Sequence, residues 1–105
     1  MSDGISPQEA IPMLEELWDF DGFFGRLRQG IYDRDGAGIV ERLLEAIVVD
    51  DETQLPRRFV SMTWWIPMFI EWQSERVAES GGDVAQLKRD AVRLRNALDR
   101  VLGVP

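Results

Sequence analysis

Apolar residues recur at helical spacing through most of the chain, in runs separated by glycine, proline and acidic residues. The first run follows residues 6–9, Ser-Pro-Gln-Glu, which have the pattern of a capping box that starts a helix. Pro12 removes one early hydrogen bond, so either the first turn is separate or the main helix starts near Pro12 and ends near Phe20. In both cases one helix face carries Ile11, Leu14, Leu17 and Trp18.

Two further runs predict a short helix and a longer one, with a loop between them. Phe23, Phe24 and Leu27 predict about two turns of helix, closed by Gly30. Residues 33–38, Asp-Arg-Asp-Gly-Ala-Gly, predict the clearest internal loop, and its aspartates are placed to cap the next helix. That helix should end at the acidic residues 50–52, and its apolar face consists of Ile39, Leu43, Leu44, Ile47 and Val48.

Residues 57–76 form an aromatic segment that holds three of the four tryptophans. A helix is predicted to start at Leu55-Pro56 and to be kinked or broken at Pro67. A strand over residues 59–66 is the alternative, but polar and apolar positions do not alternate there. One helix face cannot bury every large side chain, so at least one tryptophan should be exposed, and Trp72 between acidic neighbours is the best candidate. The buried face should be Phe59, Met62, Trp65, Ile66, Phe69 and Ile70.

The last run has a heptad-like seam. A turn at residues 80–82 ends the preceding helix, and Asp83 is placed to cap the next one. These elements predict an all-α fold, a small antiparallel helical bundle of four to five helices with a C-terminal helical hairpin, in a single domain over residues 1–105. The seam either packs inside this bundle or joins two copies of the chain. Its residues are Val84, Leu87, Ala91, Leu94, Leu98 and Val101.

The composition argues against catalysis. The 105-residue chain has no histidine and no cysteine, so it lacks the usual proton shuttle, zinc ligands and thiol nucleophile. It also contains no GxxxxGK[ST], GxGxxG or GxSxG motif. We therefore expect a binding protein rather than an enzyme, with no cofactor.

Two possible metal sites are also unconvincing. Residues 33–44 match a calcium loop at its first, third and sixth positions, but Ala37 and Leu44 stand where oxygen ligands are required. Glu41 and Glu45 could share a divalent ion on one helix face, but no histidine supports them. We expect no metal.

Charge points to the kind of partner. The net charge is −7 and the isoelectric point is about 4.5, with 13 acids and four arginines in residues 1–54. Such a surface repels nucleic acid and anionic membranes and attracts basic proteins. No signal peptide and no apolar run of membrane-spanning length is recognisable. We expect a cytoplasmic protein with a basic protein partner, no direct nucleic-acid contact and no membrane.

Acids at helix ends and in loops, together with part of the aromatic segment, are the candidates for contacting that partner. Most of these acids could instead cap helices, but those of residues 50–52 follow a helix carboxyl end, where negative charge is unfavourable. Glu71, Glu75 and Glu79 form a like-charged row, relieved either by Lys88 across the hairpin or by a basic partner. The candidate partner-binding residues are Asp19, Asp21, Tyr32, Asp33, Asp35, Asp50, Asp51, Glu52, Glu71, Trp72 and Glu75.

The segments WDFDGFFGRLRQGIYD and WWIPMFIEWQSER, in an acidic helical chain of this length, resemble the small cytoplasmic immunity proteins of bacterial polymorphic-toxin and contact-dependent growth inhibition systems. The resemblance covers size, acidity and aromatic content. It implies a stoichiometric inhibitor that occludes the active site of one cognate basic toxin domain, often a nuclease, as a monomer in a one-to-one complex.

Three other hypotheses remain. A self-associating helical adaptor or secretion chaperone would use the seam between Val84 and Val101 to form a dimer. An acidic mimic of nucleic acid would bind a host DNA-binding protein instead of a toxin. A metal-dependent enzyme built on glutamate pairs is the least supported of the three.

Overall fold

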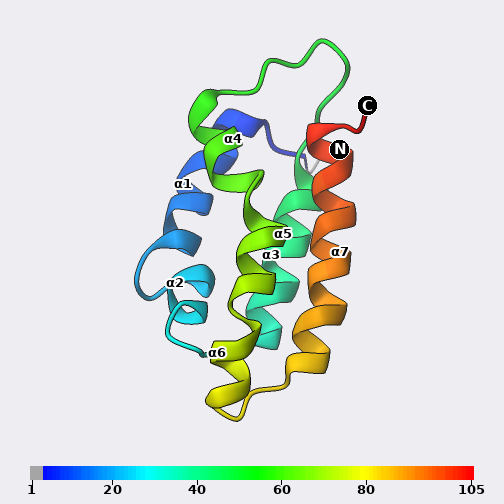
Figure 1. Cartoon of the computed structure of the whole chain (residues 1–105). Helices are drawn as coiled ribbons and strands as arrows, with labels where there is room; N and C mark the ends of the chain where they lie inside the picture. Colours follow the sequence, from blue (N-terminus) through cyan, green and yellow to red (C-terminus); the bar gives the residue numbers. More distant parts are fainter. Residues whose placement is uncertain (1–3) are drawn as a thin grey trace.

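The computed structural model describes residues 4–105, which form a helical bundle 43 Å long; residues 1–3 lie outside this part (Figure 1). The predicted all-α fold is confirmed. Residues 4–105 contain no strand, and their only β-type pairing is an isolated bridge between Ile5 and Ile47. One cluster of buried side chains fills the core. The helices are α1 (Pro7–Trp18), α2 (Phe23–Leu27), α3 (Arg34–Ala46), α4 (Arg57–Thr63), α5 (Ile66–Trp72), α6 (Ser74–Glu79) and α7 (Val84–Leu102).

Helix α1 begins with the predicted capping box. The backbone N–H of Glu9 donates to Ser6 Oγ at 3.1 Å, and the backbone N–H of Ser6 donates to Glu9 Oε1 at 3.0 Å. The predicted interruption at Pro12 is wrong, because the helix runs through Pro12 and ends at Trp18. Gln8 and Pro12 are both exposed, so water can bond the carbonyl that the proline leaves unpaired.

The loop predicted at residues 33–38 is also wrong, since α3 begins at Arg34 and includes both glycines. Gly36 and Ala37 are buried, and a Cβ on Gly36 would lie 2.8 Å from Cδ1 of Phe23. These small residues let α3 pack closely against α2, which outweighs the low helix propensity of glycine. Asp33 stands at the N-cap position, but its side chain forms no cap hydrogen bond.

The predicted apolar face of α3 is only partly correct. Leu44 and Ile47 are buried, whereas Ile39 and Val48 are exposed and Val40 takes a core position instead. The buried face is set by Ala37, Val40 and Leu44, spaced by three and four residues, whereas Val48 lies beyond the end of the helix at Ala46.

The aromatic segment is helical as predicted, but it is interrupted twice. Trp64 and Trp65 form a turn between α4 and α5, and Gln73 separates α5 from α6. Pro67 explains the first break, because it has no N–H for the carbonyl of Thr63, where α4 ends. The aromatic segment is thus divided into three short helices, and residues 4–105 contain seven helical segments in all. The predicted inward face is buried except for Trp65, which is half-buried.

The heptad seam of α7 packs inside the bundle, against α3 and α5. Asp83 caps this helix, since its Oδ1 accepts the backbone N–H of Gln86 at 3.0 Å. Near the other end, Arg100 Nη2 donates to the carbonyl oxygens of Leu44 at 2.7 Å and Ile47 at 3.1 Å. The seam is covered by the chain's own helices, so it offers no free face to a second copy.

Candidate protein-binding groove

Helix α1 has two rows of apolar side chains. Ala10 and Leu14 are buried in the core, whereas Met13 and Leu17 belong to a second row that lines a groove beside α3. Ile39 and Leu43 of α3 line the other side of the groove, and the four apolar side chains together form its floor. Met13 is 47% exposed and Ile39 52% exposed, so the groove has an open apolar floor. Its volume is about 540 Å³.

Three carboxylates border this floor, one from α1 and two from the turn that follows. Glu16, Asp19 and Asp21 all line the groove. Gly22 makes the turn possible, since a Cβ there would lie 2.0 Å from the carbonyl oxygen of Glu16. The turn is also held by Asp19 Oδ1, which accepts the backbone N–H of Phe20 at 3.0 Å.

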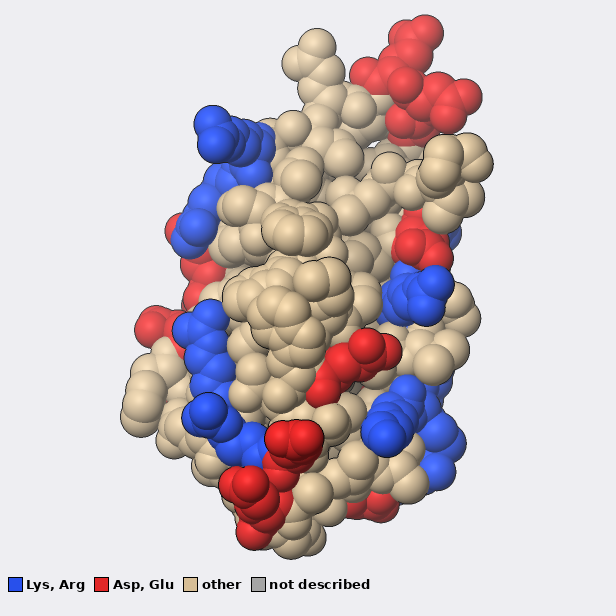
Figure 2. All heavy atoms as spheres, viewed as in Figure 1, with Lys and Arg blue, Asp and Glu red and all other residues tan. Residues whose placement is uncertain are grey.

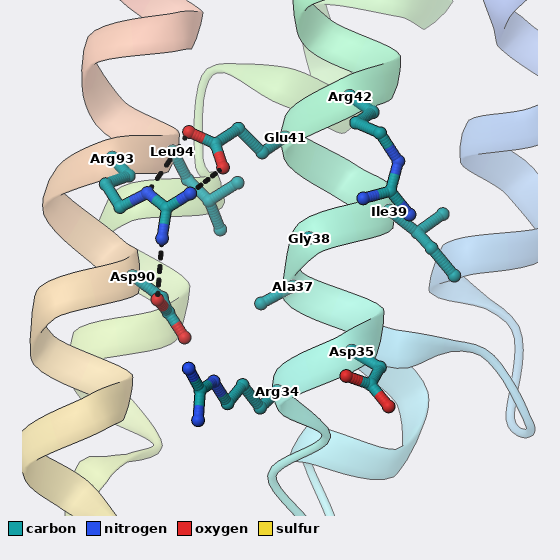
Figure 3. A pocket seen from close by; sticks show the side chains of 10 residues that line it. All are labelled: Arg34, Asp35, Ala37, Gly38, Ile39, Glu41, Arg42, Asp90, Arg93 and Leu94. Carbon is teal, nitrogen blue, oxygen red and sulfur yellow. Dashed lines mark hydrogen bonds and ion pairs between the residues drawn. The ribbon is translucent and has the colours of Figure 1, made fainter.

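The charged residues that line the groove are all acidic. Its lining contains no lysine or arginine, and within residues 4–105 none of Glu16, Asp19 and Asp21 forms an ion pair. The nearest cation along α3 is Arg42, which points to the same side of the helix as Ile39 (Figure 3). An apolar floor with a carboxylate border suits a cationic amphipathic surface and repels anions.

Asp33 and Asp35, the next two candidates, lie away from the groove. Asp33 Oδ2 pairs with Arg26 Nη1 at 3.6 Å, which links the start of α3 to α2. Asp35 lines a separate hollow of about 300 Å³ between α3 and α7. Neither acid lines the groove itself, although Asp35 lies one turn before Ile39, which lines both hollows.

The charges of the hollow between α3 and α7 largely neutralise one another (Figure 3). Arg93 Nη2 lies 2.6 Å from Glu41 Oε1, and Arg93 Nη1 lies 3.7 Å from Asp90 Oδ1. Asp90 is buried and also accepts Gln86 Nε2 at 2.8 Å. This network joins α3 to α7 and leaves little charge for a ligand.

Tyr32 is part of that network rather than of an exposed surface. Its hydroxyl donates a hydrogen bond to Asp90 Oδ2, and its ring lies 6.1 Å from that of Phe23, edge to face. Burial, followed by the hydrogen bond and the negative charge of Asp90, raises the pKa of Tyr32 above its ordinary value. The structure therefore gives Tyr32 a packing role.

Asp50, Asp51 and Glu52 lie in the loop between α3 and α4, at the end of the bundle away from α2 and α6 (Figure 1). Asp50 Oδ1 accepts the backbone N–H of Glu52 at 2.9 Å and the hydroxyl of Thr53 at 3.0 Å. These hydrogen bonds, that of Thr53 first, lower the pKa of Asp50. The loop forms a second acidic group, separate from the groove.

Glu71 and Trp72 lie on α5, and Glu75 lies on α6. Trp72 is 62% exposed, as predicted. The ion pair expected between Glu75 and Lys88 is absent among residues 4–105, and the whole glutamate row is unpaired there. The predicted relief of the row across the hairpin is therefore wrong.

The candidate acids thus occupy several surfaces: Asp19 and Asp21 border the groove between α1 and α3, and Glu71 lines a different hollow beside α7. Sequence reasoning missed Met13 and Glu16. The signal was present, because Met13, Leu17 and Phe20 are spaced by four and three residues and form a second apolar row beside the core row.

No three acidic side chains in the described part of the chain lie close enough together to hold a metal ion. Likewise, none of the helices within residues 4–105 has the length and apolar character needed to cross a bilayer. No protein-family model matches the chain, and no curated protein or solved structure matches it significantly.

Proposed function

We propose that this chain is an acidic binding protein that neutralises a basic partner by one-to-one binding in the groove between α1 and α3. The observation that supports this most strongly is the combination, within residues 4–105, of an apolar floor with three carboxylates that form no ion pair and no lining cation. The proposed place of action is the cytoplasm.

The occupant that fits this chemistry is an amphipathic helix of the partner with lysines or arginines beside its apolar side chains. Helices α1 and α3 form the two walls of the groove. A third helix lying between them would cover Met13 and Ile39 while its cations face Glu16, Asp19 and Asp21. The carboxylates would speed the encounter, and the apolar contacts would slow dissociation.

The resemblance to toxin immunity proteins indicates which kind of basic partner this proposal concerns. A toxin nuclease has a basic surface for the phosphates of its substrate, and a carboxylate-bordered groove is complementary to such a surface. Binding there would occlude the toxin's active site. The net charge of −7 favours the same encounter at long range.

The binding step can be tested with two model peptides that share one apolar helix face, one with lysines and the other with glutamates beside it. The ¹⁵N-labelled chain is titrated with each peptide and followed by NMR. We expect only the lysine peptide to bind, with shifts concentrated at Met13, Leu17, Ile39 and Leu43. Equal binding of both peptides, or shifts confined to α5 and α6, would contradict the proposal.

A matched pair of variants sharpens this experiment. Ile39→Asp places a charge on the apolar floor and should weaken binding at least tenfold. Val48→Asp makes the same change at a similarly exposed position beyond the end of α3 and should leave binding unchanged.

For the toxin itself, the protein encoded next to this chain is assayed for nuclease activity with and without an equimolar amount of the chain.

A further inference from the structure

An aromatic stripe, defined as Trp64, Met68 and Trp72, runs from the turn before α5 along the exposed side of α5. The three side chains are 55%, 44% and 62% exposed and lie four residues apart. Trp72 stands edge-on against the half-buried Trp65, with ring centroids 5.6 Å apart, so its indole is supported by the fold. Figure 2 shows a large uncharged patch in the middle of this face.

The stripe and two of the charges that flank it are spaced symmetrically along the sequence about Met68. Trp64 and Trp72 lie four residues before and after Met68, and Arg57 and Glu79 lie eleven residues before and after it. Arg57 and Glu79 are exposed, and neither forms an ion pair within residues 4–105. Helices α4, α5 and α6 follow one another along one side of the bundle, so the basic end and the acidic end lie on opposite sides of the stripe (Figures 1 and 2).

We propose that the aromatic stripe is a self-association surface, on which a second copy of the chain docks antiparallel about a two-fold axis through Met68. Two-fold pairing places Trp64 of each copy against Trp72 of the other. The same rotation brings Arg57 of each copy toward Glu79 of the other, so each copy supplies the counter-charges that the other lacks. A second copy satisfies both the apolar centre and the charges at both ends.

The size of the stripe sets the strength of the contact. Two half-exposed indoles and one methionine expose on the order of 400 Å² per copy. The total for two copies stays below the roughly 1,200 Å² of stable interfaces, even though exposed tryptophans are strong anchors. The dimer should therefore be weak, with a dissociation constant on the order of tens of micromolar.

This contact is independent of the proposed groove. The groove is lined by α1, α3 and the turn after α1, and it shares no residue with the stripe. It also differs from the α7 seam, which is covered inside the bundle. A failure of the peptide titration therefore leaves the dimer proposal intact, and the reverse also holds.

The test is sedimentation velocity on the whole chain from 5 to 500 µM. We expect a concentration-dependent shift from 12.1 kDa toward twice that mass. Trp72→Ala should weaken the dimer at least tenfold, and Met68→Lys should abolish it by placing two cations at the axis. Phe20→Ala removes a similarly exposed ring on another face and serves as the control.

A charge swap tests the orientation. Arg57→Glu and Glu79→Arg should each weaken the dimer several-fold. Dimerisation should return when the two single variants are mixed in equal amounts. It should also return in the double variant alone. A chain that stays monomeric at 500 µM would overturn the proposal, as would a dimer unaffected by Trp72→Ala. If the double variant failed to dimerise as strongly as the parent chain, the antiparallel pairing would be overturned. Circular dichroism of each variant establishes that it is folded, as expected for exposed positions.

Discussion

The indole Nε1 of Trp18 donates a 2.9 Å hydrogen bond to the backbone carbonyl oxygen of Met62. This contact joins the last residue of α1 to the last turn of α4. The carbonyl needs an external donor because Pro67 breaks the helix and leaves the final carbonyls of α4 without their usual partners. Trp18 thus supplies a hydrogen-bond donor at the break between α4 and α5.

Trp18→Phe should lower the free energy of unfolding by about 1–3 kcal/mol, because a half-buried carbonyl loses its donor. Phenylalanine keeps the ring stacked near Phe24, whose centroid lies 4.2 Å from that of Trp18. Urea unfolding at low protein concentration measures the change. Trp72→Phe is the matched control and should stay within about 0.5 kcal/mol. Equal effects at both positions would show that this hydrogen bond is unimportant.

Two glycines of α3 should respond to alanine in opposite directions. Gly36→Ala pushes a methyl group to within 2.8 Å of the buried ring of Phe23, and overpacking of this kind costs about 1–3 kcal/mol. A Cβ on Gly38 meets only Arg42 Nη1 at 3.6 Å, so Gly38→Ala should stabilise by about 0.5–1 kcal/mol through helix propensity. Thermal unfolding of the two variants gives the sign, and a stabilising Gly36→Ala would contradict the packing argument.

Stability should fall in alkaline solution because of Tyr32. Its pKa is raised in the folded state, so the stability it contributes is complete below the unfolded value of about 10 and is lost as pH rises above it. Tyr32→Phe should lower the free energy of unfolding by about 1–3 kcal/mol at pH 7, since Asp90 loses a donor. The difference in the free energy of unfolding between the parent chain and Tyr32→Phe should be smaller at pH 11 than at pH 7.

Urea unfolding at pH 7 and pH 11 measures this difference. The chain has one tyrosine, so absorbance of tyrosinate follows its ionisation directly. The folded protein should keep Tyr32 protonated at pH values where the urea-unfolded chain has ionised. If Tyr32 ionised over the same pH range in the folded and the urea-unfolded chain, its proposed coupling to Asp90 would be contradicted.

The separate acidic groups should affect partner binding in different ways. Reversing Asp19 and Asp21 to lysine should slow association of the lysine peptide about tenfold at low salt and also speed its dissociation, because these acids border the groove. Reversing Asp50 and Asp51 should reduce only the association rate, and by less, since the loop acts at long range. Stopped-flow kinetics at two salt concentrations separate these effects, and a larger effect of the loop pair would place the interface there.

Local signals made part of this fold predictable. The caps at Ser6 and Asp83 and the α7 seam depend on residues within one or two turns, and all three were confirmed. The start of α3 was not predictable in this way, because the close approach of Gly36 to Phe23, which lies in another helix, is not visible in local spacing.

The candidate site was less predictable than the fold. Asp19 and Asp21 were identified from charge alone, but grouping them with Glu16 around an apolar floor requires the packing of α1 beside α3. The same packing separates them from the equally acidic Asp50 loop. The exposure of Trp72 was predictable, because a single helix face cannot bury the whole aromatic segment.

The position of α7 determines when this fold can form during protein synthesis. Arg100 supplies the donors for the carbonyls at the end of α3, and the seam of α7 covers both α3 and α5. Until α7 has left the ribosome, those carbonyls and core side chains such as Val40 and Ile70 have no partner from it. The core between α3, α5 and α7 therefore closes only once α7 is available to pack against the other two helices.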